Sequence, residues 1–279
     1  MKPLLSIVCI TYNQEQYIKE TIEGFLNQKT NFPIEIIIHD DASRDETPKI
    51  LKKYADADSR IKLILQTENQ YSKGVRIWSK YCFPICRGKY IALCEGDDYW
   101  TDPLKLQKQV DFLEENDDYS LCMHTVQRYN QQTNIFTPEN EWLGTSTLKD
   151  ILLQNITYTN AVVFRYNFEA PKWYDESPVG DWPLFVILAK KGKIMKLNET
   201  MGVYRIHNEG VWSKLSEIRK IENDIIIYKL FIDNLELEKE DFKALNDKYK
   251  KAKKKLRKFK FRKFKNKLKK IVGIQTKDN

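Results

Sequence analysis

Three carboxylates lie within four residues at Glu95, Asp97 and Asp98. They follow Tyr90–Cys94, a short apolar run that is typical of a strand buried on both faces. Because open α/β sheets bind ligands at the carboxyl ends of their strands, we expect these acids to face a ligand. Carboxylates this close repel one another unless a cation or strong donors meet them. Hard oxygen ligands suit Mg²⁺ or Mn²⁺, ions that often share their coordination with substrate phosphates.

A second pair of acids, Asp40 and Asp41, ends the apolar run Ile34–His39. Each acidic turn has an alternative interpretation as a solvated turn or a helix cap, and Asp102-Pro103 could begin such a helix. No G-x-G-x-x-G follows the first apolar run and no G-x-x-x-x-G-K-[ST] occurs. The sequence therefore favours a ligand held through side chains and a cation, in place of a glycine-rich phosphate loop.

The elements that must position these acids alternate between strand and helix patterns. Strands are predicted at 4–10, 34–39, 61–65 and 90–94, and helices at 13–28, 47–55 and 73–86, the last broken near Pro84. This alternation predicts an α/β fold with a mostly parallel, Rossmann-like central sheet flanked by helices. Further along, we expect a helix at 104–116, paired strands at 120–126 and 134–136, a strand at 160–165, a helix at 181–190, strands at 194–197 and 202–206, and a long helix after 213.

Composition limits the classes of protein to which the chain can belong. The 279 residues are 42% hydrophobic, enough for a full core. The chain opens directly into a strand pattern and holds no apolar run of about 18 residues, so we expect a cytoplasmic protein. The five cysteines, an odd number, fit a reducing compartment. Cys82 and Cys86 share a helical face, but no histidine is placed to complete a zinc site with them, which favours packing.

Three segments of the chain resemble the family-two inverting glycosyltransferases, which have a GT-A fold that binds nucleotide-diphospho-sugars. SIVCITYNQEQYIKETIEGFLNQ is similar to the opening strand, turn and helix of that family. IEIIIHDDASRDET is similar to the second strand with its D-D-x-S-x-D motif, and YIALCEGDDYW to the D-x-D segment. The resemblance covers residues 4–115 well and 155–212 more loosely. It departs from the D-x-D pattern at Glu95, a longer carboxylate.

The resemblance implies a set of substrate-binding residues. Thr11 and Tyr12 would line the base pocket, and Asp41 would accept the N3 hydrogen of uracil. Arg76 could reach the diphosphate, although a solvated arginine is equally consistent with its place in the sequence. The complete implied set is Thr11, Tyr12, Asn13, Asp40, Asp41, Arg76, Glu95, Gly96, Asp97, Asp98, Arg205 and His207.

The same resemblance implies the catalytic and metal-binding residues. Asp97 would be the first ligand of Mn²⁺ or Mg²⁺, with Asp98 either sharing the ion or supporting its ligands. His207 would contact the metal or the diphosphate, while Glu95 would lie nearer the ribose. Inversion needs one general base, and Asp181, at the start of a predicted helix, is the candidate. A helix N-terminus also favours its ionised form, although Asp181 could serve only as a cap. A lone histidine such as His207 is more often structural than a ligand, but the family frequently has Y-R-x-H at this place.

Charge is divided sharply along the chain. The total is +8, yet residues 248–270 contain 15 Lys or Arg and no acid, so the rest of the chain carries about −7. Apolar residues interleave with these cations in two sets at helical spacing: Tyr249, Ala252, Leu256 and Phe259, then Phe261, Phe264, Leu268 and Ile271. This pattern predicts a helix that could lie on an anionic membrane surface; an oligomerisation helix and a nucleic-acid patch are the alternatives.

Together these features predict two parts. Residues 1–212 would form the GT-A catalytic domain, with a nucleotide-binding half at 1–115 and an acceptor-binding half at 116–212. Residues 213–279 would form a helical extension with a basic amphipathic tail. The predicted function is metal-dependent transfer of a sugar from a nucleotide diphosphate, UDP by preference, to a glycan or lipid-linked acceptor in bacterial surface polysaccharide synthesis, at the inner face of the plasma membrane.

Two other functions remain open at this point. A sugar-phosphate nucleotidyltransferase also sets carboxylates and Mg²⁺ at strand ends, but it needs a glycine-rich activating loop that the first strand lacks. A nucleic-acid-binding protein could act through the basic tail, against which the acidic body argues. The sugar, the acceptor and the linkage depend on loops between residues 129 and 177.

Overall fold

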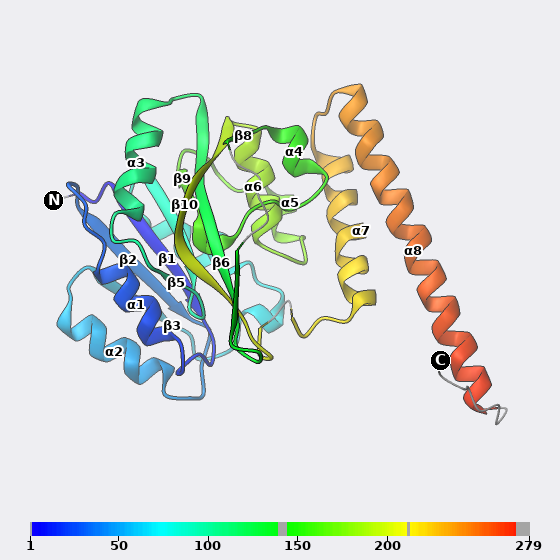
Figure 1. The fold of residues 1–279 in the computed structure, drawn as a ribbon, viewed down its shortest axis with the longest axis horizontal. Coiled ribbons are helices and arrows are strands. Elements are labelled where there is room, and N and C mark those ends of the chain that lie inside the picture. The colour runs from blue at the N-terminus through cyan, green and yellow to red at the C-terminus, as the bar shows by residue number, and fades with distance from the viewer. Residues whose placement is uncertain (1, 139–143, 211–212, 272–279) are drawn as a thin grey trace. The chain divides into compact units, whose positions relative to one another are not determined.

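The structure is a computed structural model that describes residues 2–138, 144–210 and 213–271, with the backbone alone at 264 and 266–271. The chain forms two compact units (Figure 1). The first unit comprises Met1–Asp175 and Gly180–Asn208, and the second Glu176–Val179 and Glu209–Asn279.

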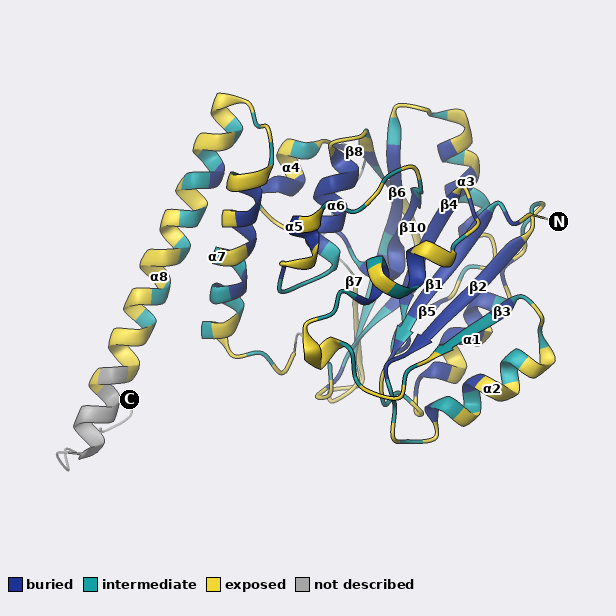
Figure 2. Ribbon diagram, turned by 180° about the vertical axis from the view of Figure 1, so that it is seen from behind, coloured by how far each residue is buried: buried dark blue, intermediate teal, exposed yellow. Residues whose placement is uncertain are grey.

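Four parallel strands form the first half of the sheet, in the spatial order β3-β2-β1-β4. Their bounds are β1 Leu5–Thr11, β2 Ile34–Asp40, β3 Ile61–Leu65 and β4 Tyr90–Glu95. The helices that connect them are α1 Ile18–Leu26 and α2 Thr47–Ala57. Strands β1, β2 and β4 are buried along nearly all of their length (Figure 2), which is why their sequences are apolar without alternation. The first half therefore aligns the carboxyl ends of β1, β2 and β4 at one edge.

The second half extends this sheet in the order β4-β9-β6-β10-β5. Its strands are β5 Tyr99–Trp100, β6 Tyr119–Asn130, β9 Val163–Arg165 and β10 Lys193–Ile206, with β7 Ile135–Pro138 paired to β6 and β8 Gly144–Ser146 paired to β10. The short strand β9 is antiparallel to both β4 and β6, and β10 is parallel to β6. All of the longer strands consequently run in one direction, which confirms the predicted mostly parallel α/β fold.

Helices α1, α2 and α3 Lys105–Glu115 contribute to one core with the apolar side chains of the first strands (Figure 1). The remaining helices of the first unit are α4 Leu148–Leu152, α5 Lys172–Asp175 and α6 Asp181–Ala189. α6 is apolar all round, and every residue after its first is buried. Its N-terminus therefore has a fixed position, which matters because Asp181 is its first residue.

Several predicted elements differ in detail. The predicted helix at 13–28 begins only at Ile18, because Asn13 adopts a left-handed conformation with φ 52°. The predicted helix at 73–86 is instead a series of short turns: 3-10 helices at Tyr71–Lys73 and Phe83–Ile85, and a π-helix at Trp78–Cys82. The two predicted closing strands are one strand, β10, whose register shifts between Leu197 and Gly202.

The second unit contains α7 Glu217–Asn234 and α8 Lys239–Ile271, which pack against each other. Ser216 caps α7 by accepting the backbone N–H of Arg219 at 3.3 Å, and Lys260 of α8 pairs with Glu222 of α7 at 2.9 Å. The first apolar set of the basic tail, Tyr249 to Phe259, is half-buried, whereas Phe261 is 59% exposed. The side chains of Phe264, Leu268 and Ile271 lie outside the described residues.

Candidate active site

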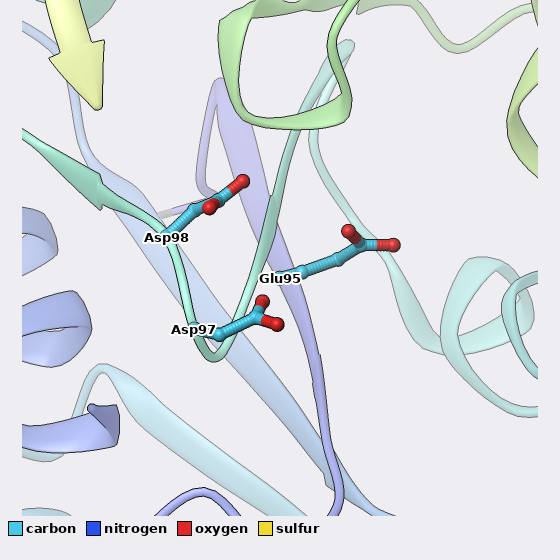
Figure 3. A group of neighbouring side chains, drawn as sticks. All are labelled: Glu95, Asp97 and Asp98. Atoms are coloured by element: carbon cyan, nitrogen blue, oxygen red, sulfur yellow. The ribbon is translucent and has the colours of Figure 1, made fainter. Parts of the chain in front are cut away.

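The three acids at the end of β4 lie in one tight turn, residues 95–98, which we call the acid turn (Figure 3). One carboxylate oxygen from each of Glu95, Asp97 and Asp98 lies within 4.8 Å of the others. Gly96 permits the turn, since a Cβ there would lie 2.8 Å from the Thr11 side chain at the end of β1. The acid turn therefore packs directly against the end of the neighbouring strand.

Contacts from two other elements fix this turn. The hydroxyl of Thr21 on α1 donates to the backbone carbonyls of Gly96 at 3.0 Å and Asp98 at 2.7 Å. Beyond β10, the Nε2 atom of His207 lies 2.9 Å from Asp97 Oδ2. The backbone N–H of Arg205 donates to Asp98 Oδ1 at 2.8 Å. Both ends of the acid turn are thus held in place by hydrogen bonds.

Burial and mutual repulsion make the acid turn costly to ionise. Burial, followed by the charges of Asp97 and Asp181, raises the pKa of Glu95 from 4.5 to about 8. Burial and the charge of Asp97 raise the pKa of Asp98 well above its usual value. Among the described residues, Asp98 Oδ2 and His207 Nδ1 are buried without a hydrogen-bond partner. Three hard oxygen donors with an imidazole beside them and one unpaired oxygen fit a divalent cation.

Asp181 lies close enough to the acid turn for its charge to raise the pKa of Glu95. Its Oδ2 accepts a hydrogen bond from Asn155 Nδ2 at 2.9 Å. Burial raises the pKa of Asp181, while its backbone hydrogen bonds and the charge of Arg76 oppose that rise. Ahead of it, Gly180 packs closely on Trp78, whose ring would lie 3.1 Å from a Cβ at that position. A half-buried carboxylate with a raised pKa is suited to accept a proton.

The other acid pair, at the end of β2, has a different environment. Asp41 accepts the backbone N–H groups of Gln70 at 2.7 Å and Tyr71 at 3.0 Å. Asp40 accepts the backbone N–H of Ser43 at 3.0 Å and its hydroxyl at 2.5 Å. These acids brace the loops after β2 and β3. A carboxylate has about four lone-pair positions, so Asp41 retains the capacity to accept a further donor.

The turn after β1 lies between the acid pair at the end of β2 and the acid turn. Thr11 pairs in register with Asp40, and the preceding residue of β1, Ile10, pairs with Glu95. Thr11 is buried, whereas Tyr12 is 41% exposed and free to stack on a ligand. Asn13, the first residue of the helix predicted at 13–28, lies before α1 and accepts the backbone N–H of Arg44 at 2.8 Å. The structure thus brings the residues predicted at the ends of β1, β2 and β4 to one edge of the sheet.

Arg205, predicted as a substrate-binding residue, lies at the end of β10 next to the acid turn. Its guanidinium pairs with Glu20 at 2.7 Å and lies between the rings of Tyr17 and Tyr99, at 4.8 and 5.0 Å from their centroids. Its backbone N–H donates to Asp98 of the acid turn. Arg76, in turn, lies 5.7 Å from the Tyr174 ring and beside Asp181.

Sequence reasoning missed two residues that shape the site, Thr21 and Asn155. Thr21 is one polar residue on the buried face of an amphipathic helix, and this placement was the one signal that could have identified it. Asn155 lies outside any motif, and only the fold brings it to Asp181.

Comparisons with known proteins place this architecture in a family. The family model "Glycosyl transferase family 2" matches residues 6–170. An uncharacterized protein of Mycobacterium tuberculosis is 42% identical over 214 residues, which are 75% of this chain and 60% of that protein. The chain thus spans less than two thirds of that relative's length. The Escherichia coli UDP-Glc:α-D-GlcNAc-diphosphoundecaprenol β-1,3-glucosyltransferase WfaP is 32% identical over 208 residues, covering 73% of this chain and 78% of WfaP.

Among solved structures, S. aureus TarS residues 1–349 in complex with UDP-GlcNAc superimposes with a TM-score of 0.67 at 19% sequence identity. The match covers 89% of this chain and 72% of the TarS chain. At this identity the likeness concerns the fold alone, and it confirms the GT-A architecture predicted from the sequence. With the family model matched over more than half of its residues, the chain belongs to glycosyl transferase family 2.

Proposed function

We propose that this protein is a metal-dependent, inverting glycosyltransferase that moves a sugar from a nucleotide diphosphate, UDP by preference, to a glycan or lipid-linked acceptor. The observation that carries the proposal is the convergence of Glu95, Asp97 and Asp98 within 4.8 Å, beside the carboxylate of Asp181. These acids are costly to ionise without a compensating cation, so they suit a site that a divalent ion and a diphosphate complete.

The acid turn would hold Mn²⁺ or Mg²⁺ through Asp97 and Asp98, with His207 beside Asp97. Such an ion, when bound, neutralises negative charge on a departing diphosphate, so no general acid is required. Thr21 and the backbone of Arg205 keep the carboxylates in position. In this assignment the protein's own contribution is a preorganised set of oxygens, which costs no rearrangement when the donor binds.

Asp181 is the general base in this proposal. As the acceptor hydroxyl oxygen bonds to the anomeric carbon, Asp181 takes its proton and the bond from that carbon to the phosphate oxygen breaks on the opposite face. The raised pKa of Asp181 strengthens it as a base, while the N-terminus of α6 and the charge of Arg76 favour the ionised form that must receive the proton. Asn155 orients one oxygen, Oδ2.

The nucleoside would lie against the ends of β1 and β2. Tyr12 offers an exposed ring for stacking on the base, and Asp41 offers a carboxylate to the N3 hydrogen of uracil. Thr11, Asn13 and Asp40 complete this side of the site through the loops that they brace. The names of two relatives support the donor and pathway: WfaP is a UDP-glucose-dependent enzyme, and a Bacillus subtilis relative, 27% identical over 220 residues, is named for teichuronic acid biosynthesis.

Calorimetric titration of UDP with and without Mn²⁺ tests the proposal. Binding should require Mn²⁺ and should be lost in Asp97→Ala, whereas Asp117→Ala, which removes a carboxylate that is 96% exposed, should bind like the parent. Equal UDP binding with and without Mn²⁺ would contradict metal dependence. Salt-sensitive RNA binding without any response to nucleotide would favour nucleic-acid binding through the basic tail.

A peripheral membrane site is the second part of the proposal. Among the described residues, no helix combines the length and apolar character that a membrane span requires. The lysines of α8 from Lys248 to Lys265 are exposed and no acid interrupts them, a distribution that attracts an anionic inner leaflet. Replacing the exposed lysines of α8 with glutamine should abolish sedimentation with anionic vesicles at low salt; neutral vesicles are the control. Unchanged sedimentation would remove the membrane from the proposal.

A further inference from the structure

A depression of about 390 Å³ lies on the first unit beside the acid turn, and we call it the aromatic basin. It is lined mainly by Tyr17, Glu20, Tyr99, Tyr129, Phe136 and Arg205. These residues come from α1 and its N-cap, β5, the β6–β7 hairpin and β10. The volume lies in the range of small-molecule sites, which begins at about 300 Å³. None of these residues except Arg205 was predicted from the sequence to bind a substrate.

One wall of the aromatic basin is a stacked ring pair. Tyr129 on β6 and Phe136 on β7 have centroids 4.4 Å apart and planes inclined by 24°. Phe136 remains 46% exposed, and Tyr129 is fixed by donating to Asn134 at 2.8 Å. An exposed aromatic face is a large apolar surface at low entropic cost. The C–H face of a pyranose ring is a flat apolar surface of matching size.

The floor of the aromatic basin is polar. Glu20 and Arg205 form an ion pair at 2.7 Å, and the Tyr17 hydroxyl donates to Gln131 Oε1 at 2.7 Å. The Glu20 side chain is 53% exposed and that of Arg205 8%, so Glu20 presents the accessible acceptor and Arg205 fixes its position. A sugar hydroxyl, which is both a donor and an acceptor, can donate to this carboxylate.

Two residues of the aromatic basin, Tyr17 and Arg205, connect it to the acid turn. The Tyr17 ring lies 4.9 Å from the His207 ring, which contacts Asp97, and the Arg205 backbone holds Asp98. Aromatic walls over a mixed-charge floor favour a neutral polyhydroxylated ligand over a lipid surface or an anion. Resting on the glycosyltransferase function proposed above, we propose that the aromatic basin is a pyranose-binding subsite that holds a saccharide unit of the acceptor.

Saturation-transfer NMR on the full chain tests this subsite. The probes are the methyl β-glycosides of glucose, galactose, mannose and N-acetylglucosamine, with UDP and Mn²⁺ at saturating concentration to occupy the donor site. At least one glycoside should receive saturation. Phe136→Ala should weaken its binding about tenfold, which corresponds to about 1.4 kcal/mol, because the stacked wall is lost.

Two further variants make this result specific. Phe136→Tyr keeps the ring and should bind like the parent, as should Phe242→Ala, which removes a phenylalanine of similar exposure, 43%, from α8. If none of the four glycosides receives saturation, or if the saturation signal survives in Phe136→Ala, the proposed subsite is overturned. UDP binding in the same samples separates the two proposals: if Mn²⁺-dependent UDP binding persists while no glycoside binds, only the subsite fails.

Discussion

The ends of β2 and β4 carry the same kind of residue and serve different purposes. β2 ends in two acids and β4 in three, at one edge of the sheet and on either side of β1. At the end of β2, Asp41 accepts two backbone N–H groups and Asp40 accepts two donors from Ser43. In the acid turn, by contrast, Glu95 and Asp98 have strongly raised pKa values and Asp98 Oδ2 has no partner among the described residues.

The difference shows that the number of hydrogen-bond donors determines what a strand-end acid does. Asp40 and Asp41, which accept two donors each, are compensated within the protein and fix loops. In the acid turn the backbone N–H of Arg205 reaches Asp98 Oδ1, but Oδ2 has no partner among the described residues, so carboxylates that face one another gain most from a bound cation. In this protein the first kind holds the loops after β2 and β3, and the second kind forms the candidate cation site.

The largest expected effect concerns the chemical step. Asp181→Asn keeps the shape and the hydrogen bond to Asn155 but removes the proton acceptor, so sugar transfer should fall about a thousandfold. Binding of UDP with Mn²⁺ should persist. The measurement is single-turnover transfer at saturating donor, with UDP affinity determined separately.

The control for this variant is Asp175→Asn, which changes an exposed acid of α5 that accepts the hydroxyl of Ser79 at 2.8 Å. Its transfer rate should stay within about twofold of the parent, since surface substitutions rarely act at a distance. If Asp181→Asn were as active as Asp175→Asn, then Asp181 would be only a helix-terminal acid, and the base would have to be sought elsewhere.

The next effect is the pH dependence of metal-free stability. The pKa of Glu95 is raised from 4.5 to about 8, so the folded chain binds more protons than the unfolded chain between these values. This contribution to stability is fully present below about pH 4.5 and is lost as pH rises through about 8, at a rate of up to about 1.4 kcal/mol per pH unit for one proton.

Denaturant unfolding in the presence of a chelator, from about pH 5 to 8, measures this slope. Glu95→Gln should flatten it, because the group no longer titrates. Added Mn²⁺ should stabilise the parent most at the upper end of the range, where the acids are ionised. A slope that is the same in Glu95→Gln and the parent would show that the acid turn is better compensated than its geometry suggests.

The fold was largely predictable and the site only in part, for physical reasons. β1, β2 and β4 are buried on both faces, so their apolar runs identified them and placed Asp41 and Asp97 at one edge. A helix was predicted at 73–86, but the segment from Tyr71 to Ile85 folds into short 3-10 and π-helical turns. The first of these turns ends at Gly74, which has a positive φ. Thr21 escaped notice because its function depends on two carbonyls about 75 residues away.

A smaller effect is expected at the end of β2. Asp41→Ala leaves the backbone N–H groups of Gln70 and Tyr71 without their acceptor, and the free energy of unfolding should fall by about 2 kcal/mol. Asp56→Ala, at an exposed position of α2, is the control and should change it by less than about 0.5 kcal/mol. Equal stability of the two variants would mean that Asp41 does not anchor the loop after β3.

The smallest effect tests whether charge itself matters at the end of β2. Asp40→Asn keeps one oxygen to accept the Ser43 backbone N–H, and its new amide can donate to the Ser43 hydroxyl, which reverses that hydrogen bond. Burial raises the pKa of Asp40, which means that its negative charge is unfavourable in the folded state, and the substitution removes that charge. These changes oppose each other, and the free energy of unfolding should move by less than about 1 kcal/mol in either direction. Chemical denaturation measures it, and a loss above about 3 kcal/mol would show that the carboxylate at the end of β2, in contrast to the acid turn, depends on its negative charge.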